Sequence, residues 1–213
     1  MRYRNREEAG DLLADAIRTA QPDLVAEGAL VLGVPRGGVV VAAAVAHRLG
    51  LPLDVALARK LGAPHNRELA IGAIAEGGAV WLNQDLLARL RIDGEWVEKA
   101  VVREELEIAR RARRYRRGRD AAPVTGRSLI VVDDGVATGA TLASVLQALR
   151  RRYPSRLVCA VPVAPPDSVA MLAAHCDAVV CPMQPAWFDA VGAWYDDFTQ
   201  TSDTEVEALL TAS

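Results

Sequence analysis

The chain has 213 residues, which is enough for one sizeable α/β domain and few for two. Because 51% of the residues are hydrophobic, a complete core can form, and a formal net charge of -2 excludes the overall basic character typical of nucleic-acid or membrane-surface binding. The stretch MRYRNREEAG is polar and unlike a signal peptide, and no apolar run is long enough to span a bilayer. We therefore expect a cytoplasmic protein without a membrane partner.

The first part of the chain alternates between helix and strand patterns. Asn5 to Thr19 predicts a surface helix with Asn5 as its N-cap, and Ala29 to Leu32 predicts the first core strand. The run from Val39 to Leu49 is alanine-rich and too long for a strand, so it predicts a buried helix. Leu53 to Ala58 predicts the second strand.

The middle of the chain is irregular at first and then strongly helical. Residues 59–78 hold Gly, Pro, His and Asn together, which predicts a mobile loop or short hairpin. Asn83 to Leu90 predicts a short helix, and Asp93 to about Arg116 a long charged one. Seven arginines between Arg110 and Arg119 follow several glutamates by one helical turn, which favours ion pairing along the helix. Contact of these arginines with RNA phosphates is the alternative interpretation.

The last part again alternates between strands and helices. Leu129 to Val132 predicts the central strand, and Thr141 to Arg152 the helix that follows it. Further strand, helix and strand patterns cover residues 157–163, 168–174 and 178–181, before an aromatic tail at 182–198 and a helix at 205–210 capped by Asp203. This alternation predicts an α/β fold with a doubly wound, mostly parallel sheet, in one domain over residues 1–213.

The segment Ser128 to Leu142, SLIVVDDGVATGATL, carries the densest set of chemical features in the chain. A β-branched strand leads into Asp133 and Asp134, and a turn of small residues then opens a helix. The backbone N–H groups of such a turn, the helix N-terminus and the hydroxyl groups of Thr138 and Thr141 together form a phosphate cradle. The two acids would repel a bare phosphate, so they favour a sugar diol or a hydrated metal ion.

This segment resembles the phosphoribosyl-pyrophosphate (PRPP) motif of the type I phosphoribosyltransferases. The resemblance implies that Asp133 and Asp134 hold the ribose hydroxyl groups directly or through water on Mg²⁺, which would be the cofactor. It implies transfer of the 5-phosphoribosyl group from PRPP to a nucleobase or related nitrogen heterocycle, with release of pyrophosphate. The residues implied to bind the 5′-phosphate are Ala137, Thr138, Gly139, Ala140 and Thr141.

Two further segments complete the predicted donor site. Val34-Pro35-Arg36-Gly37-Gly38 lies between a strand and a helix, and the resemblance assigns pyrophosphate binding to Arg36, Gly37 and Gly38. Arg59 and Lys60 leave the carboxyl end of the second predicted strand, in a segment that resembles Arg-Lys-x-Gly of the adenine-type enzymes. That resemblance implies that both bind pyrophosphate and that about 59–80 forms a lid over the site.

The motifs indicate the residues that contact the acceptor base less directly than those that bind PRPP. Ala137 stands where the 6-oxopurine enzymes carry an aspartate that contacts the base, as it does in the adenine and orotate types. In the adenine type a lid glutamate contacts the base, which implies Glu76 as a catalytic residue beside the two aspartates, with Glu68 second. The alternative is that both glutamates are solvated loop acids. His65 is a candidate proton donor, although a single loop histidine is more often incidental.

Aromatic residues crowd the region after the last predicted strand. We expect this region, about 182–200, to form a small C-terminal hood in which Trp187 or Phe188 stacks on the acceptor base. For Trp194 and Tyr195, a place in the hood core or in a dimer contact is the preferred interpretation, and a homodimer is expected. Cys159, Cys176 and Cys181 are not spaced as a zinc site.

The segments PRGG, RKLGAP, ELAIGA and WYxDF make nearly the whole chain similar to a bacterial family of uncharacterised phosphoribosyltransferases. A regulator that senses PRPP or nucleotides, and uses the Arg110–Arg119 helix on RNA, is the alternative. The cations Arg36, Arg59 and Lys60 argue against it, since a sensor can lose the pyrophosphate machinery. A hydrolase or phosphorylase is a weaker hypothesis, because the sequence shows no pair of histidine and carboxylate that would activate water.

Overall fold

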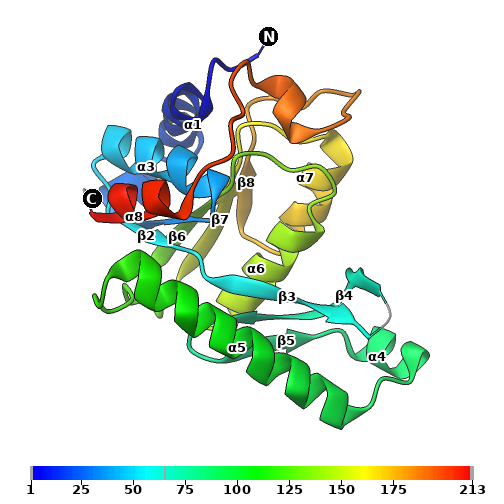
Figure 1. The fold of residues 1–213 in the computed structure, drawn as a ribbon. Helices are drawn as coiled ribbons and strands as arrows, with labels where there is room; N and C mark the ends of the chain where they lie inside the picture. The colour runs from blue at the N-terminus through cyan, green and yellow to red at the C-terminus, as the bar shows by residue number, and fades with distance from the viewer. Residues whose placement is uncertain (1, 65, 212–213) are drawn as a thin grey trace.

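A computed structural model describes residues 2–64 and 66–211, and only the backbone of residues 67 and 68. The central sheet has the order β2-β1-β6-β7-β8, and all its neighbouring strands are parallel. Figure 1 shows these strands at the centre of the larger half of the molecule. The strands are β1 (Leu30–Gly33), β2 (Leu53–Val55), β6 (Ser128–Val132), β7 (Arg156–Ala160) and β8 (Ala178–Val180). The predicted α/β fold with a mostly parallel sheet is confirmed.

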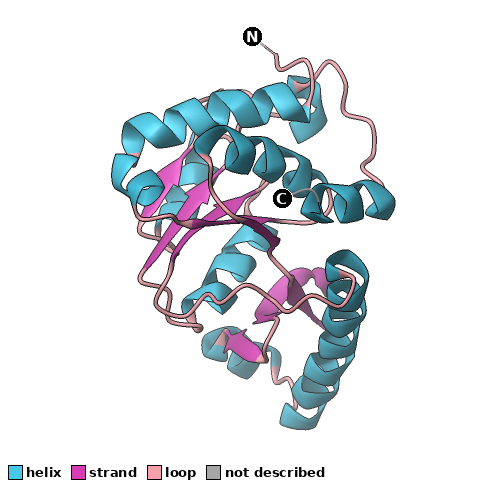
Figure 2. Cartoon of the chain, turned by 90° about the vertical axis from the view of Figure 1, so that its left-hand side faces the viewer, coloured by secondary structure: helices cyan, strands magenta, loops and turns pink. Residues whose placement is uncertain are grey.

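Helices cover both faces of this sheet (Figure 2). Because successive strand residues point to opposite faces, Leu30 and Leu32 pack on one side and Val31 on the other. The first side is covered by α6 (Ala140–Arg150) and α7 (Pro166–Ala173), and the second by α1 (Arg6–Ala20) and α3 (Gly37–Leu49). A short helix, α2 (Pro22–Ala26), joins α1 to β1. The side chain of Asn5 caps α1, as predicted, by accepting from the N–H group of Glu8.

The segment predicted as a mobile loop or short hairpin is a second sheet. Its strands are β3 (Ala58–Ala63), β4 (Asn66–Ala75) and β5 (Ala79–Leu82), all antiparallel in the order β3-β4-β5. Leu61 and Ile74 of this sheet pack with Ile108 of α5 (Gly94–Arg116), whereas Ala73 packs with Ala148 of α6. The sheet therefore lies between α5 and α6. The contacts that hold it join residues that are far apart in the sequence. The helix α4 (Gln84–Leu90) leads from β5 to α5.

The C-terminal segment returns to both halves of the molecule. After β8 it contains one 3-10 turn, η1 (Val191–Trp194), and the helix α8 (Asp203–Thr211), which lies beside α3 and α5. The predicted cap residue Asp203 does not cap this helix. Its carboxylate accepts hydrogen bonds from Tyr115 (2.7 Å) and Arg114 (2.6 Å), while the hydroxyl of Ser202 accepts from the N–H group of Glu205.

Ion pairs engage most of the arginine run in α5. Arg110 and Arg111 both pair with Glu107, as the helical spacing predicts, and Arg114 pairs with Glu207 of α8. A hydrogen bond from the side chain of Arg119 to the carbonyl group of Leu210 adds to the contact with α8. Ion pairing along the helix, the preferred interpretation, is therefore observed for Arg110 and Arg111, and α8 supplies the acid for Arg114. Within the described residues, no helix is long and apolar enough to cross a membrane.

Candidate active site

The loops after β1 and β6 bring the predicted pyrophosphate turn against the acid pair. A Cβ atom on Gly37 would lie 2.0 Å from Oδ2 of Asp134, and one on Gly38 would lie 2.7 Å from Oδ1 of Asp133. Both positions therefore require glycine, because any side chain would displace a carboxylate. The loops meet because they leave the carboxyl ends of neighbouring parallel strands. The peptide bond before Arg36 is cis.

The carboxylate of Asp134 is held by Arg6, the first residue of α1. The Nε atom of Arg6 lies 2.8 Å from Oδ2 of Asp134, and both side chains are largely buried. The Arg6 guanidinium also lies 3.9 Å from the ring centroid of Phe198 and donates to the carbonyl oxygen of Thr199 (2.8 Å). Tyr195 donates from its hydroxyl to the backbone carbonyl of Asp134. The N-terminus and the aromatic tail thus position this acid together, a contact that local sequence patterns did not indicate.

Burial raises the pKa of both acids. For Asp133, the charge of Asp134 adds to the effect of burial and raises the pKa well above its usual range. For Asp134, the hydrogen bond and charge of Arg6 oppose burial, and the pKa is still raised. Asp134 is therefore paired with Arg6. The ionised form of Asp133 needs a further positive group to stabilise it.

Replacement of Arg6 by Gln is expected to destabilise the protein by about 1–3 kcal/mol at pH 7, because it leaves the Asp134 carboxylate buried without its partner. The cost should shrink as the pH falls through the raised pKa of Asp134, since the protonated acid needs no cation. Chemical unfolding at pH 7 and pH 5 measures both effects. The exposed Arg4, which pairs with Glu8, provides the control Arg4→Gln. Equal stability of both variants at pH 7 would show that Arg6 does not hold the acid.

The predicted 5′-phosphate turn opens α6 with an accessible backbone. Gly139 has a φ of +74°, a left-handed conformation that favours glycine, and a Cβ atom there would lie 2.4 Å from Cε of Met171. The residues around it, Ala137, Thr138, Ala140 and Thr141, are exposed. The first N–H groups of a helix have no acceptor within it, so this turn offers donors to an anion.

A cavity of about 480 Å³ lies between the two sheets and links the predicted donor-site segments. Pro35 from the loop after β1, Arg59 and Lys60 from β3, and Thr141 from α6 all line it. The other predicted ligands of PRPP are not among its lining residues: Arg36, Gly37, Gly38, Asp133, Asp134 and residues 137–140. Of the predicted ligands of PRPP, the structure thus brings Arg59, Lys60 and Thr141 to one cleft, while Gly37 and Gly38 meet the acid pair.

One wall of this cleft comes from α5, which the sequence analysis did not include in the site. The α5 residues in the lining are Trp96, Arg103, Glu104, Ile108 and Arg111. Their spacing places them on one helical face, which is the signal that could have indicated them. Glu104 accepts from Arg59 (2.9 Å) and from Arg103 (3.1 Å). Burial alone would raise the pKa of Glu104, but these hydrogen bonds lower it below its usual value.

Glu76, the predicted contact to the acceptor base, does not line the cleft. It follows β4, and its carboxylate accepts a 2.6 Å hydrogen bond from Arg116, which also binds Asp54. The charge of Glu76 is thus used to hold a buried arginine, and the geometry gives no support to a role at the base. The two other acceptor-side candidates cannot be placed, because His65 and the side chain of Glu68 lie outside the described residues.

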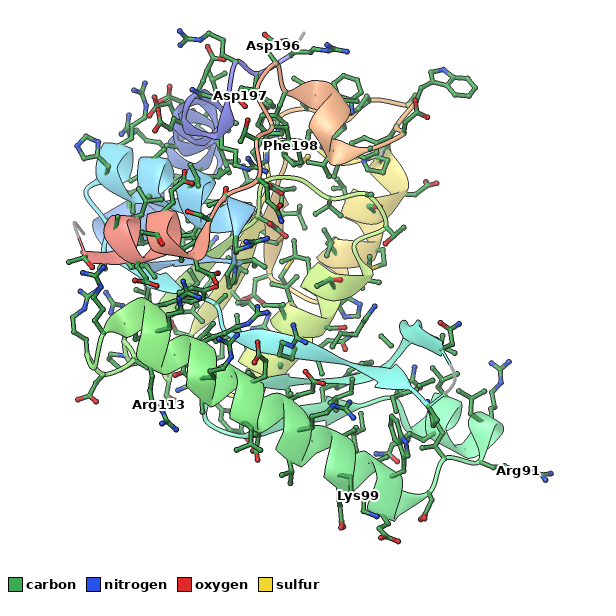
Figure 3. The ribbon with its side chains drawn as sticks, viewed as in Figure 1. Arg91, Lys99, Arg113, Asp196, Asp197 and Phe198 are labelled. Atoms are coloured by element: carbon green, nitrogen blue, oxygen red, sulfur yellow. The ribbon has the colours of Figure 1, made fainter. Side chains whose placement is uncertain are left out.

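The predicted base-stacking residues do not line the cleft either. Trp187 is 91% exposed, and the ring of Phe188 is stacked on Trp194 at 6.1 Å between centroids. Phe188, Trp194 and Phe198 belong to an aromatic cluster around buried Tyr3 and Tyr195. Figure 3 shows the part of the tail from Asp196 to Phe198. The tail therefore has its own aromatic core, which holds Arg6 and Asp134 in place.

The carboxylates of Asp133 and Asp134 suit a metal ion that also binds oxygen atoms of the substrate. Among the described residues, no group of three or more His, Cys, Asp or Glu side chains could hold an ion alone. Two adjacent carboxylates with raised pKa values, Asp133 and Asp134, can hold Mg²⁺ only when water and substrate oxygens complete its shell. Such shared binding is usual for Mg²⁺ at phosphate sites. The three described cysteines are all free thiols.

The chain is an α/β protein in which two glycine-containing turns and an acid pair meet at the ends of neighbouring parallel strands. The family model for the phosphoribosyl transferase domain matches residues 4–197, so the chain belongs to this family of transferases. Two Mycobacterium tuberculosis proteins, from strains CDC 1551 and H37Rv, are provisionally named phosphoribosyl transferase and are 47% identical over 208 residues. The match covers 98% of this chain but 46% of theirs, so the chain spans about half the length of these relatives.

Solved structures agree with the fold. The crystal structure of TT1426 from Thermus thermophilus is similar with a TM-score of 0.90 and 46% identity, over 100% of this chain and 99% of that one. The AQ2163 protein from Aquifex aeolicus has a TM-score of 0.52 at 9% identity, over 88% of this chain and 78% of that one, and shares the fold alone.

Proposed function

We propose that the protein transfers the 5-phosphoribosyl group of PRPP to a nucleobase or related nitrogen heterocycle and releases pyrophosphate. One observation carries the proposal: Gly37 and Gly38 lie directly against Asp134 and Asp133, beside a cleft lined by Lys60 and Thr141. Membership of the phosphoribosyl transferase family supports PRPP as the donor. The nucleobase as acceptor rests on the resemblance of the site motifs.

In this proposal the chain binds the donor at both ends. The N–H groups at the start of α6, with Thr138 and Thr141, bind the 5′-phosphate, and Arg36 to Gly38 with Arg59 and Lys60 bind the pyrophosphate. Asp133 and Asp134 hold the ribose hydroxyl groups between them. Mg²⁺, when bound beside Asp133 and Asp134, supplies positive charge for the leaving pyrophosphate.

The transfer then requires stabilisation of the positive charge on ribose and of the negative charge on pyrophosphate. It requires no covalent nucleophile of the protein. Departure of pyrophosphate from C1 gives the ribose ring a cation-like transition state, which the carboxylates of Asp133 and Asp134 favour. The leaving group gains negative charge as the bond breaks, and the cations Arg59 and Lys60 stabilise it where it develops. The cleft between the sheets limits access of water, which would otherwise hydrolyse the activated sugar.

The test is a pyrophosphate-release assay with the chain, PRPP, Mg²⁺ and a panel of purines, pyrimidines and other nitrogen heterocycles. One member of the panel should give release well above the rate without an acceptor. Binding of PRPP without release for any acceptor would contradict the transferase proposal and favour a PRPP-sensing regulator. Absence of PRPP binding would contradict the donor site itself.

A further inference from the structure

The α5 wall of the cleft carries cations that the predicted pyrophosphate ligands do not include. Arg103 and Arg111 line the same cavity as Arg59 and Lys60. The two α5 arginines are eight residues apart on one face of the helix, which separates their Cα atoms by about 12 Å along its axis. Cationic side chains of both β3 and α5 therefore line the cleft.

The described residues that line this cleft include more basic than acidic side chains. Four described lining residues are basic, and Glu104 is the single acid among them. Glu104 is already bonded to Arg59 and Arg103, and the partner of Arg111 is Glu107, which Arg110 shares. Because converging cations in a partly enclosed cleft raise its potential, the cleft attracts an anion that carries several negative charges.

The arginines keep donors for such an anion. Each guanidinium has five N–H groups in a planar fork. The bonds of Arg59 and Arg103 to Glu104, and of Arg111 to Glu107, all use the Nε atom. The carboxylates thus fix the stems of the side chains, while the terminal amino groups match the spacing of phosphate oxygens.

We propose that Arg103 and Arg111 of α5 bind the diphosphate of the donor and the released pyrophosphate, as a third wall of that subsite facing β3. The inference rests on the proposed function. It assigns the arginines on the cleft-facing side of α5 to the ligand and those on the opposite side to the solvent-exposed surface. Arg111 serves the ligand, whereas Arg113 and Lys99 lie on the outer side of the helix (Figure 3).

Isothermal titration of the whole chain with inorganic pyrophosphate and Mg²⁺ tests the inference. The double variant Arg103→Gln with Arg111→Gln keeps the aliphatic stems and removes both charges. It should bind pyrophosphate at least about tenfold more weakly per arginine removed. The matched control, Lys99→Gln with Arg113→Gln, removes two cations from the outer side of α5 and should keep the wild-type affinity. Ribose 5-phosphate, which needs only the turn at the start of α6, should bind all three proteins equally.

Each other result has a distinct meaning. Wild-type pyrophosphate affinity in the cleft-facing variant, or equal weakening in both double variants, would overturn the inference and leave the proposed function standing. Weaker binding of ribose 5-phosphate by the cleft-facing variant would also overturn it, because the effect would then not be local to the diphosphate. Failure of the unmodified chain to bind pyrophosphate and PRPP would overturn the donor site and the inference together.

Discussion

Replacement of both acids, Asp133→Asn with Asp134→Asn, should abolish phosphoribosyl transfer in a protein that remains folded. The amides keep the shape of the side chains but remove the charge that stabilises the cationic ribose and holds Mg²⁺. We expect a fall in the rate of pyrophosphate release by about three orders of magnitude or more, since even one electrostatic contact to a transition state contributes 10²–10³. The measurement is the release assay at saturating PRPP with the acceptor found in the panel.

The double variant should remain folded, although it loses the ion pair between Arg6 and Asp134. Burial and mutual repulsion raise the pKa of Asp133, so its ionised form costs folding free energy above that pKa. Removal of that cost partly offsets the loss of the Arg6 partner, so the circular dichroism spectrum should match wild type and the free energy of unfolding should fall by at most about 1–3 kcal/mol, as for Arg6→Gln. Asp11, an exposed acid of α1, provides the control Asp11→Asn, which should keep full activity. Turnover by the double variant within tenfold of wild type would contradict the assigned role of the acids.

Replacement of Arg116 by Ala should produce the largest loss of stability. Its side chain is only 6% exposed, and its guanidinium donates to Asp54 (2.9 Å) and to Glu76 (2.6 Å). Removal of one partner from a buried ion pair leaves uncompensated charge and costs about 3–5 kcal/mol. For a chain of this size the unfolding midpoint should fall by about 10 °C, as measured by calorimetry.

Two further variants show whether this effect comes from the buried charge. Arg113→Ala removes an exposed arginine from the same helix and should keep the wild-type midpoint. Arg116→Lys keeps the charge but lacks the planar fork, so it should recover only part of the loss. Similar midpoints for Arg113→Ala and Arg116→Ala would show that the three-residue cluster of Arg116, Asp54 and Glu76 does not hold the two sheets together.

Local patterns were sufficient to predict the parallel sheet and the two turns that meet at the acid pair. The strand at 129–132 was short, apolar and β-branched, and it forms β6 at the centre of the sheet. The turns after β1 and β6 were visible because glycines, threonines and paired acids cluster there. The two turns lie close together because the carboxyl ends of parallel strands share one edge of the sheet.

Other features needed contacts that are distant in the sequence. Residues 59–78 looked irregular because Gly, Pro and Asn interrupt their pattern, yet α5 and α6 pack on the two faces of this sheet and order it. Glu76 was predicted to contact the acceptor base, with a solvated loop acid as the alternative, but its carboxylate accepts from Arg116, forty positions later. Asp203 had the pattern of a helix cap, but Tyr115 and Arg114 take its carboxylate.

The amino-acid sequence by itself determined the class of fold, the two glycine-containing turns and the acid pair, because each depends on residues within one turn or one strand of the chain. Only the tertiary structure decided which cations share the cleft, which acids are occupied by arginines, and how Arg6 and the aromatic tail hold Asp134. These depend on the directions in which side chains from separate elements meet, and spacing along the chain does not contain that information.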